Sequence, residues 1–229
     1  MKILMTLILC LIGCGLQAQN INVLYNFRFE TFNMEQLKEL QLGQARLFPV
    51  TPTLLEDMPS GVFGSLSLEY ELNPTITVGI NPGFSSTGSR YYYEDFSGFL
   101  SNDFLVNRYD LMLSGMFKRE NNWITPFARL ETGVNFSEFE IDIRSRVGDD
   151  SSQQSILFQS IAVATRFGFG AEKKVRFLLF RLTAMYEVVI PSALKLKEDT
   201  DLQLQNARGQ VIGAQWDGLK VMASVGVSF

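Results

Sequence analysis

The sequence predicts an all-β fold: an eight-stranded antiparallel up-and-down transmembrane β-barrel. Apolar and polar residues alternate with a period of two through almost the whole chain after residue 20, as expected of strands whose two faces meet different surroundings. In each such segment one face carries no charged residue, and long connections alternate with short ones along the chain. Strands of about ten residues joined in this way are typical of barrels that cross an outer membrane.

Eight segments carry the alternating pattern. The predicted strands cover residues 23–31, 62–72, 76–80, 105–117, 124–136, 157–169, 178–188 and 219–229. From the first strand to the last, the apolar faces are centred on Phe27, Leu68, Val78, Leu111, Leu130, Val163, Leu182 and Val225. A Lys or Arg facing lipid at the middle of a bilayer costs about 2–4 kcal/mol, which explains why this face is free of charge. Pro126 also lies on it, close to a turn where a missing hydrogen bond is tolerated.

The connections predict the two ends of the barrel. Three short turns at 73–74, 119–122 and 171–174 are expected at the periplasmic rim. Four long extracellular loops are expected at the other rim, at 33–60, 85–103, 137–153 and 191–214.

Two stretches of the long loops have a character of their own. Asn33 with Gln36 three residues later predicts a helix cap, so residues 33–43 are expected to form a short helix at the barrel mouth. The aromatic stretch RYYYEDFSGF at 90–99 is interpreted as a girdle at the outer membrane interface, which we favour, or as a patch that contacts a ligand or partner.

The opposite face of the strands carries the charges. It collects six basic and six acidic residues: Arg28, Arg108, Arg129, Arg166, Arg181 and Lys220 with Glu30, Glu69, Glu71, Asp110, Glu131 and Glu187. An eight-stranded barrel has a lumen only wide enough for side chains, so inward charges must be paired. We therefore predict an ion-pair network in the lumen and no open pore. The alternative is the solvent-facing side of a soluble sheet.

The first 18 residues predict a secretory signal peptide, followed by a barrel domain at 19–229. Lys2 precedes an apolar run from Ile3 to Ile12, and cleavage after Ala18 would leave Gln19 as the first residue. Both cysteines of the chain lie in this segment, so the mature protein would have no disulfide. The sequence LIGC ending at Cys14 resembles a lipoprotein box, which keeps lipidation of Cys14 open as an alternative.

Composition excludes several classes of function. The chain contains no histidine, which excludes serine and cysteine hydrolases with a catalytic His and metal sites with His ligands. A net charge of −4 argues against a nucleic-acid partner. Ser192 and Lys195 match a Ser-x-x-Lys pattern in a loop without its companion motifs, and we do not assign it a role. Loop acids that could hold Ca²⁺ are interpreted as solvated, namely Asp149, Asp150, Glu198, Asp199 and Asp201. We expect no cofactor and no metal.

The last strand ends VMASVGVSF, with Phe229 in register with Val225 and Val227 on the apolar face. Together with the alternating segments, which span essentially residues 20–229, this pattern resembles the small eight-stranded barrels of the Gram-negative outer membrane: OmpX, the membrane domain of OmpA and the PorT-like family. The resemblance implies that Val225, Val227 and Phe229 form the signal read by the barrel-assembly machinery. It also implies contact with outer-membrane lipid.

The expected function is that of a non-enzymatic integral outer-membrane barrel. It would display extracellular loops for adhesion, envelope integrity or support of a secretion complex, with a protein partner at those loops. One alternative within the membrane class is a small pore or a conduit for a hydrophobic ligand. An alternative of another class is a soluble lipocalin-like carrier, whose apolar face would point inward.

Overall fold

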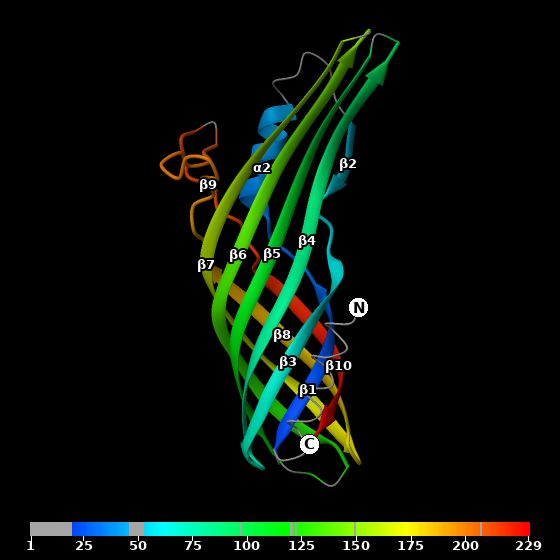
Figure 1. The fold of residues 1–229 in the computed structure, drawn as a ribbon, viewed down its shortest axis with the longest axis vertical. Helices are drawn as coiled ribbons and strands as arrows, with labels where there is room; N and C mark the ends of the chain where they lie inside the picture. The colour runs from blue at the N-terminus through cyan, green and yellow to red at the C-terminus, as the bar shows by residue number, and fades with distance from the viewer. Residues whose placement is uncertain are drawn as a thin grey trace, which may run out of the picture.

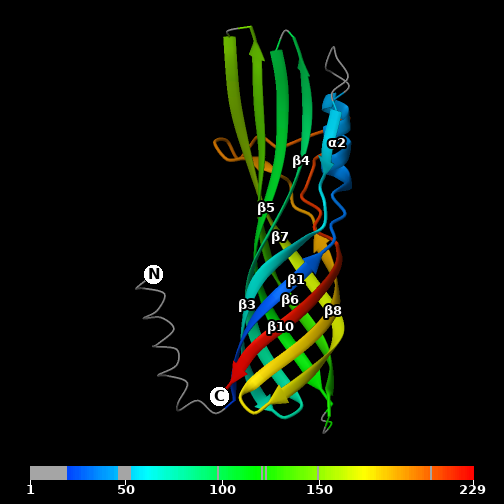
Figure 2. The ribbon, with the colours of Figure 1, turned by 90° about the vertical axis from the view of Figure 1, so that its right-hand side faces the viewer.

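The computed structural model is an antiparallel barrel that is drawn out at one end (Figures 1 and 2). The structure describes residues 20–45, 53–96, 98–119, 121, 123–148, 150–206 and 208–229. The predicted signal peptide and Cys14 lie outside these residues. Within the described ranges, no helix is long and apolar enough to cross a bilayer.

Eight strands form the barrel wall. They are β1 Ile21–Glu30, β3 Gly61–Asn73, β4 Ile76–Asp95, β5 Gly98–Lys118, β6 Thr125–Val147, β7 Asp150–Val175, β8 Leu178–Ile190 and β10 Gly218–Ser228. Each pairs antiparallel with the next, and β10 pairs with β1 to close the ring. Two short strands, β2 Thr53–Asp57 and β9 Lys195–Leu196, add to β4 and β7. The predicted eight-stranded up-and-down barrel is thereby confirmed.

Two of the four predicted long loops are wrong. Residues 85–103 and 137–153 are mostly strand, because β4, β5, β6 and β7 continue past the barrel as a four-stranded sheet that projects upward in Figure 1. The period of two persists in these segments, but the apolar parity changes. In β6 the outward Phe136 is followed by inward Phe139, Ile141 and partly buried Ile143. The predicted strands stopped where the apolar face changed sides.

The backbone explains why only these four strands project. The uppermost pair between β3 and β4 is Ser65 with Gly83, next to Pro82, which has no N–H to donate to a ladder. On the other side, the pairing of β7 with β8 ends at Val163 with Ile190. Beyond these points β4 to β7 remain paired with one another through their hairpins.

The predicted turn at 171–174 is also wrong. Strand β7 continues to Val175, and the turn is formed by Arg176 and Phe177, with Arg176 in the left-handed region at φ 57°. Polar residues in a row suggested a loop, but Glu172 faces the lumen while Lys173 faces outward. The turn after β3 lies where expected, because the Asn73 side chain accepts hydrogen bonds from the backbone of Thr75 and Ile76.

Helix α2, Glu35–Ala45, lies close to the predicted helix at 33–43. It packs against the inward face of the projecting sheet (Figure 2), in a core that also includes residues of segment 191–217. This upper core contains Met34, Leu37, Leu40, Phe104, Val106, Phe139, Ile141, Leu194, Ile212 and Trp216. It lies above the lumen and shields the apolar face that the long strands would otherwise expose.

Candidate functional site

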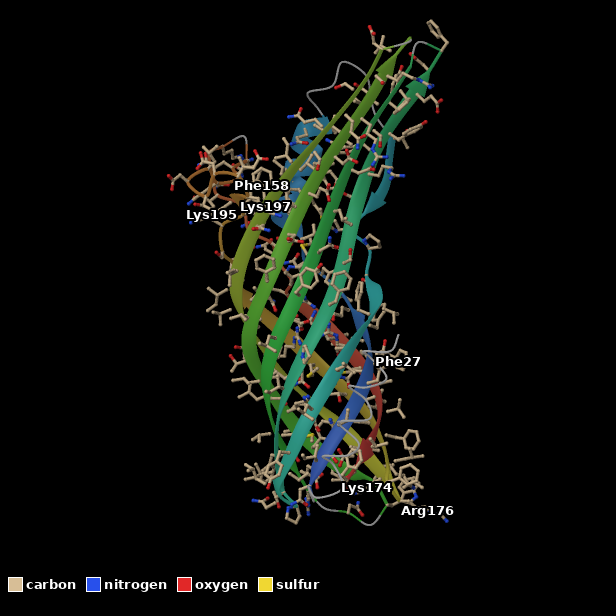
Figure 3. The ribbon with its side chains drawn as sticks, in the orientation of Figure 1. Phe27, Phe158, Lys174, Arg176, Lys195 and Lys197 are labelled. Carbon is tan, nitrogen blue, oxygen red and sulfur yellow. The ribbon has the colours of Figure 1, made fainter. Side chains whose placement is uncertain are left out.

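The outer wall of the barrel is an apolar belt. We use this name for the exposed outward residues that include Phe27, Leu68, Val78, Leu111, Leu113, Leu130, Val163, Phe167, Leu182, Tyr186 and Val225. Figure 3 shows Phe27 pointing away from the wall. On β7 the uncharged outward positions run from Ile161 to Ala171. For strands tilted by about 40° this stretch is about 25 Å tall, the height of the band that faces lipid in membrane barrels.

The belt has a defined upper edge. The last apolar row across four paired strands is Phe84, Tyr109, Phe136 and Ile161. The next outward row is polar, consisting of Ser86, Asn107, Glu138 and Gln159. Hydrogen bonds join these polar side chains in pairs, at 2.8 Å from Ser86 to Asn107 and 3.0 Å from Gln159 to Glu138.

The lower edge carries basic and aromatic residues. Lys173 lies over the ring of the exposed Trp123, 5.3 Å from its centroid. Lys174 donates a hydrogen bond to Ser228 at 2.7 Å, and Arg176 follows in the turn (Figure 3). Amphipathic rings and cations of this kind are typical of a membrane–water interface.

Charged side chains fill the lumen. Near its upper end, a pair of buried carboxylates shares two cations. Glu187 binds Arg108 at 2.9 Å and Lys220 at 2.7 Å. Glu30 binds the same two residues at 2.5 and 2.8 Å. All four side chains are inaccessible to solvent, so none of these charges is compensated by water.

Two further acids continue the network downward. Asp110 pairs with Arg28 at 2.9 Å and with Arg166. Glu131 pairs with Arg166 at 3.2 Å and with Arg129 at 2.8 Å. Arg166 therefore joins the upper and lower halves of the lumen.

The lowest layer lies near the turns. Arg181 binds Glu69 at 2.8 Å and Glu172 at 2.6 Å. Lys118 binds Glu172 and Glu71, each at 2.8 Å. Glu71 is at the rim and partly exposed, unlike the other lumen acids.

The structure places all twelve predicted lumen residues on the inward side and adds two. Lys118 was missed because it lies one residue beyond the predicted strand 105–117, and Glu172 because it was assigned to a turn. Extending the inward parity of β5 and β7 would have found both. Cations and acids are then seven each in the described lumen: Arg28, Arg108, Lys118, Arg129, Arg166, Arg181 and Lys220 with Glu30, Glu69, Glu71, Asp110, Glu131, Glu172 and Glu187.

Two neighbours complete the network. Trp216 lies at its upper end, with the Arg108 guanidinium 4.6 Å from the ring centroid and the indole N–H donating to Ser137 at 2.9 Å. At Gly83 an added Cβ would lie 2.3 Å from Asp110 Oδ1 and 2.5 Å from Arg28 Nη2. A side chain at this position would displace the two ends of this ion pair.

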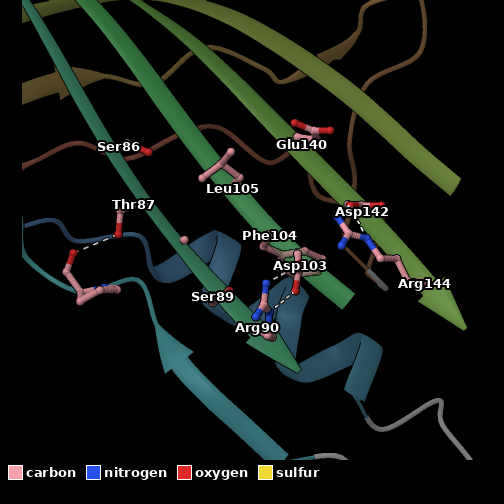
Figure 4. Close-up of a pocket in the computed structure, with 12 residues that line it drawn as sticks. Ser86, Thr87, Ser89, Arg90, Asp103, Phe104, Leu105, Glu140, Asp142 and Arg144 are labelled. Carbon is pink, nitrogen blue, oxygen red and sulfur yellow. Dashed lines mark hydrogen bonds and ion pairs between the residues drawn. The ribbon is translucent and has the colours of Figure 1, made fainter. Parts of the chain in front are cut away.

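A hollow of about 670 Å³ lies on the outer face of the projecting sheet, just above the belt (Figure 4). Arg90 donates to Asp103 at 2.5 and 2.8 Å, and Arg144 donates to Asp142 at 2.9 Å. The hydrogen bond from Arg144 lowers the pKa of the Asp142 carboxyl. These two arginines are paired with aspartates, and the third acid of the lining, Glu140, accepts a hydrogen bond from Ser155 at 2.8 Å. Among the described residues, which do not include Asp149, no acids or cysteines gather closely enough to hold a metal ion.

The aromatic stretch at 90–99 lies at the tip of the β4–β5 hairpin, far above the belt in Figure 1. Its interpretation as a membrane girdle is therefore wrong. Phe96 is fully exposed, and the Arg146 guanidinium lies 5.2 Å from the centroid of the Phe99 ring. Tyr93 donates to Asp95 at 2.9 Å. An aromatic row at the upper edge of the apolar belt is formed instead by Phe84, Tyr109 and Phe136.

The last residues lie on the outer wall beside β1. The Phe229 N–H donates to the carbonyl of Ile21 at 2.9 Å, and the carbonyl of Phe229 accepts from Asn20 at 2.9 Å. Val225 and Phe229 are exposed, and Val227 is half-buried between them. The three residues of the predicted assembly signal thus share the outward face.

No protein-family model and no curated protein matches the chain. A solved structure with a similar fold is that of Ail, the attachment invasion locus protein of Yersinia pestis. It is 16% identical, the alignment covers 93% of this chain and 100% of that one, and the TM-score is 0.38. At this level the likeness assigns neither family nor function, and the barrel is defined by its own strand pairing.

Glu187→Gln should destabilise the barrel. The carboxylate holds Arg108, Arg166 and Lys220, and removing its charge leaves buried cations short of a partner, at a cost of about 3–5 kcal/mol. The free energy of unfolding in detergent, measured by urea titration of the heat-modifiable form, would report this loss.

Glu138→Gln is the matched control for Glu187→Gln. Glu138 is an outward acid whose partner is the Gln159 amide, so the change should cost less than about 0.5 kcal/mol. Equal losses for the two variants, or steady large conductance of the wild-type barrel in planar bilayers, would contradict a lumen closed by ion pairs.

Proposed function

We propose that the protein is a non-enzymatic integral barrel of the outer membrane that holds a projecting β-sheet outside the cell for attachment to a protein partner. The observation that carries this proposal is the inverted arrangement of the wall. Apolar side chains cover the outside, and charged side chains fill the inside. Such a wall is stable where the outside meets lipid and the lumen is closed to water.

The same observation argues against a soluble carrier. A lipocalin-like barrel would turn its apolar residues inward around a ligand, whereas here buried inward positions include Arg108, Glu187 and Lys220. Outward Phe169 is 72% exposed and lies in a belt that surrounds the barrel. Soluble monomers rarely expose apolar patches larger than a few hundred Å².

The filled lumen argues against a pore or a ligand conduit. A passage would require space along the axis, and that axis is occupied by bridging side chains such as Arg166, which contacts Asp110, Glu131 and Glu187. Above it, Trp216 and the upper core lie over the lumen. The charges therefore support the wall and do not line a channel.

The orientation follows from the connections. Outer-membrane barrels have short turns on the periplasmic side and longer extracellular elements. The β3–β4 and β7–β8 turns are short and lie at the end opposite the projecting sheet (Figure 1). The sheet, α2 and segment 191–217 are then extracellular.

The tip of the sheet is the region best suited to a partner. Tyr92, Phe96 and Phe99 with Arg146 combine the residue types that contribute most to protein–protein binding. The exposed Phe96 ring contributes nothing to the cores below it. Contact with another protein would bury it.

A pair of arginine substitutions tests the membrane assignment. Leu113 lies at mid-height of the belt on β5 and is 60% exposed, so Leu113→Arg should cost about 2–4 kcal/mol in bilayers. Leu105 lies on the same face of β5 above the belt and is 40% exposed, so Leu105→Arg should cost at most about 1 kcal/mol. Unfolding titrations in lipid vesicles measure both values, and equal costs would reject the membrane assignment.

Removal of Phe229 tests the proposed assembly signal. Its deletion should lower the amount of folded, heat-modifiable barrel in the outer membrane several-fold, while synthesis of the chain is unchanged. Deletion leaves the belt above it intact, so refolding of the purified variant in detergent should be nearly normal. An unchanged yield in cells would show that Phe229 is a passive end of the strand.

Substitution at the tip tests attachment. Cells that display the barrel should adhere to partner-coated or cell-coated surfaces, and Phe96→Ser with Tyr92→Ser should reduce adhesion about tenfold, the effect of losing one hot spot. Leu202→Ser removes an apolar residue of segment 191–217 that is 55% exposed, and it should leave adhesion unchanged. Equal loss in the two variants would assign attachment to general hydrophobicity of the surface.

A further inference from the structure

A second hollow lies where segment 191–217 folds back against β7, at the upper edge of the apolar belt. It encloses about 270 Å³. Its apolar floor includes Phe136 and Ile161, which belong to the last apolar row. Its polar walls include Ser192, Lys195, Lys197 and Thr200. The hollow therefore changes from apolar to cationic at the level where the belt ends.

Backbone pairing fixes the two lysines. Lys195 pairs with Gln159 in the β7–β9 ladder, and the Lys197 N–H donates to the carbonyl of Leu157 at 2.9 Å. Residues two apart on an extended segment point to the same side. Leu194, on the alternate side, is fully buried in the upper core. Figure 3 shows Lys195 and Lys197 together beside Phe158.

The two ammonium groups have no hydrogen-bond or ion-pair partner among the described residues, although both line the hollow. This distinguishes them from the arginines of the neighbouring hollow, Arg90 and Arg144, which are paired with aspartates. By register the nearest acids on the wall are Glu138, opposite Gln159, and Glu140, opposite Leu157. Glu138 already accepts from Gln159 and Glu140 from Ser155. The acids of the following turn, Glu198, Asp199 and Asp201, do not line the hollow.

We propose that this hollow binds the anionic phosphate headgroup of an outer-leaflet lipid, with an acyl chain continuing down over Ile161 onto the belt. The proposal rests on the membrane location proposed above. A phosphate between Lys195 and Lys197 would compensate both charges, and the Ser192 and Thr200 hydroxyls could donate to its oxygens. The apolar floor suits the lipid and not a free ion.

The test measures lipid retention by the full barrel in native mass spectrometry from mixed micelles. The probes are phosphatidylglycerol and phosphatidylcholine with identical acyl chains. The wild type should retain phosphatidylglycerol preferentially. Lys195→Gln and Lys197→Gln should each lower that preference about fivefold. This factor corresponds to about 1 kcal/mol per lysine near a lipid surface.

Arg208→Gln is the matched control, because it removes one cation from the same segment but outside the hollow. It should leave the preference unchanged, and neither lysine variant should alter heat-modifiability since their ammonium groups have no partners to lose. An equal drop in Arg208→Gln, or no wild-type preference, would overturn the lipid site.

A final measurement distinguishes binding of a lipid from binding of a free phosphate ion. Millimolar inorganic phosphate should not displace phosphatidylglycerol, and displacement would show a site for free phosphate and overturn the lipid assignment. A barrel that enters vesicles normally but shows no preference would reject this site alone. A barrel that fails to enter vesicles would reject the membrane location itself.

Discussion

The narrowness of an eight-stranded lumen is the constraint on which the rest of the structure depends. Water cannot solvate charges there, so each inward charge must be neutralised by another side chain. The described lumen meets this requirement with equal numbers of cations and acids joined in one network, in which Arg166 links the upper and lower halves. The same packing fixes Gly83, because any Cβ would displace the Arg28–Asp110 pair. It also fills the axis with bridging side chains.

A single alternating pattern serves two environments along the long strands. In the lower half the apolar residues face outward, and above the row of Ser86, Asn107, Glu138 and Gln159 they face inward toward α2. Under the proposed membrane location, the change of parity marks the height at which the outer surface passes from lipid to water. The ladder itself is unchanged, so β4 to β7 continue as paired strands from the barrel wall into the projecting sheet.

Local pattern predicts much of this fold because strand period and face are properties of neighbouring residues. The eight strands, the helix near 33–43 and the inward position of residues such as Arg108 and Glu187 followed from parity alone. The extensions of β4 to β7 were missed because the apolar residues change from the outward to the inward face part-way along each strand. The sequence of one strand does not reveal the height at which this change occurs. Glu172 was missed because polar residues near a turn look alike whether they face a lumen or solvent. The ion-pair partners in the lumen depend on the register of strands around the whole ring, and the sequence of a single strand does not specify that register.

The barrel and the projecting sheet are stabilised by separate groups of residues, which leaves part of the exposed surface free to be specialised. Stability of the barrel comes from the lumen network and the belt, and stability of the projecting sheet comes from the upper core, in which α2 and Trp216 cover the inward face. The outward face above the belt and the tip contribute to neither source of stability. Phe96 there is fully exposed and belongs to no apolar core of the described residues. Under the proposed function a partner protein would bury this ring, so the attachment surface would lie at the end of the sheet farthest from the belt.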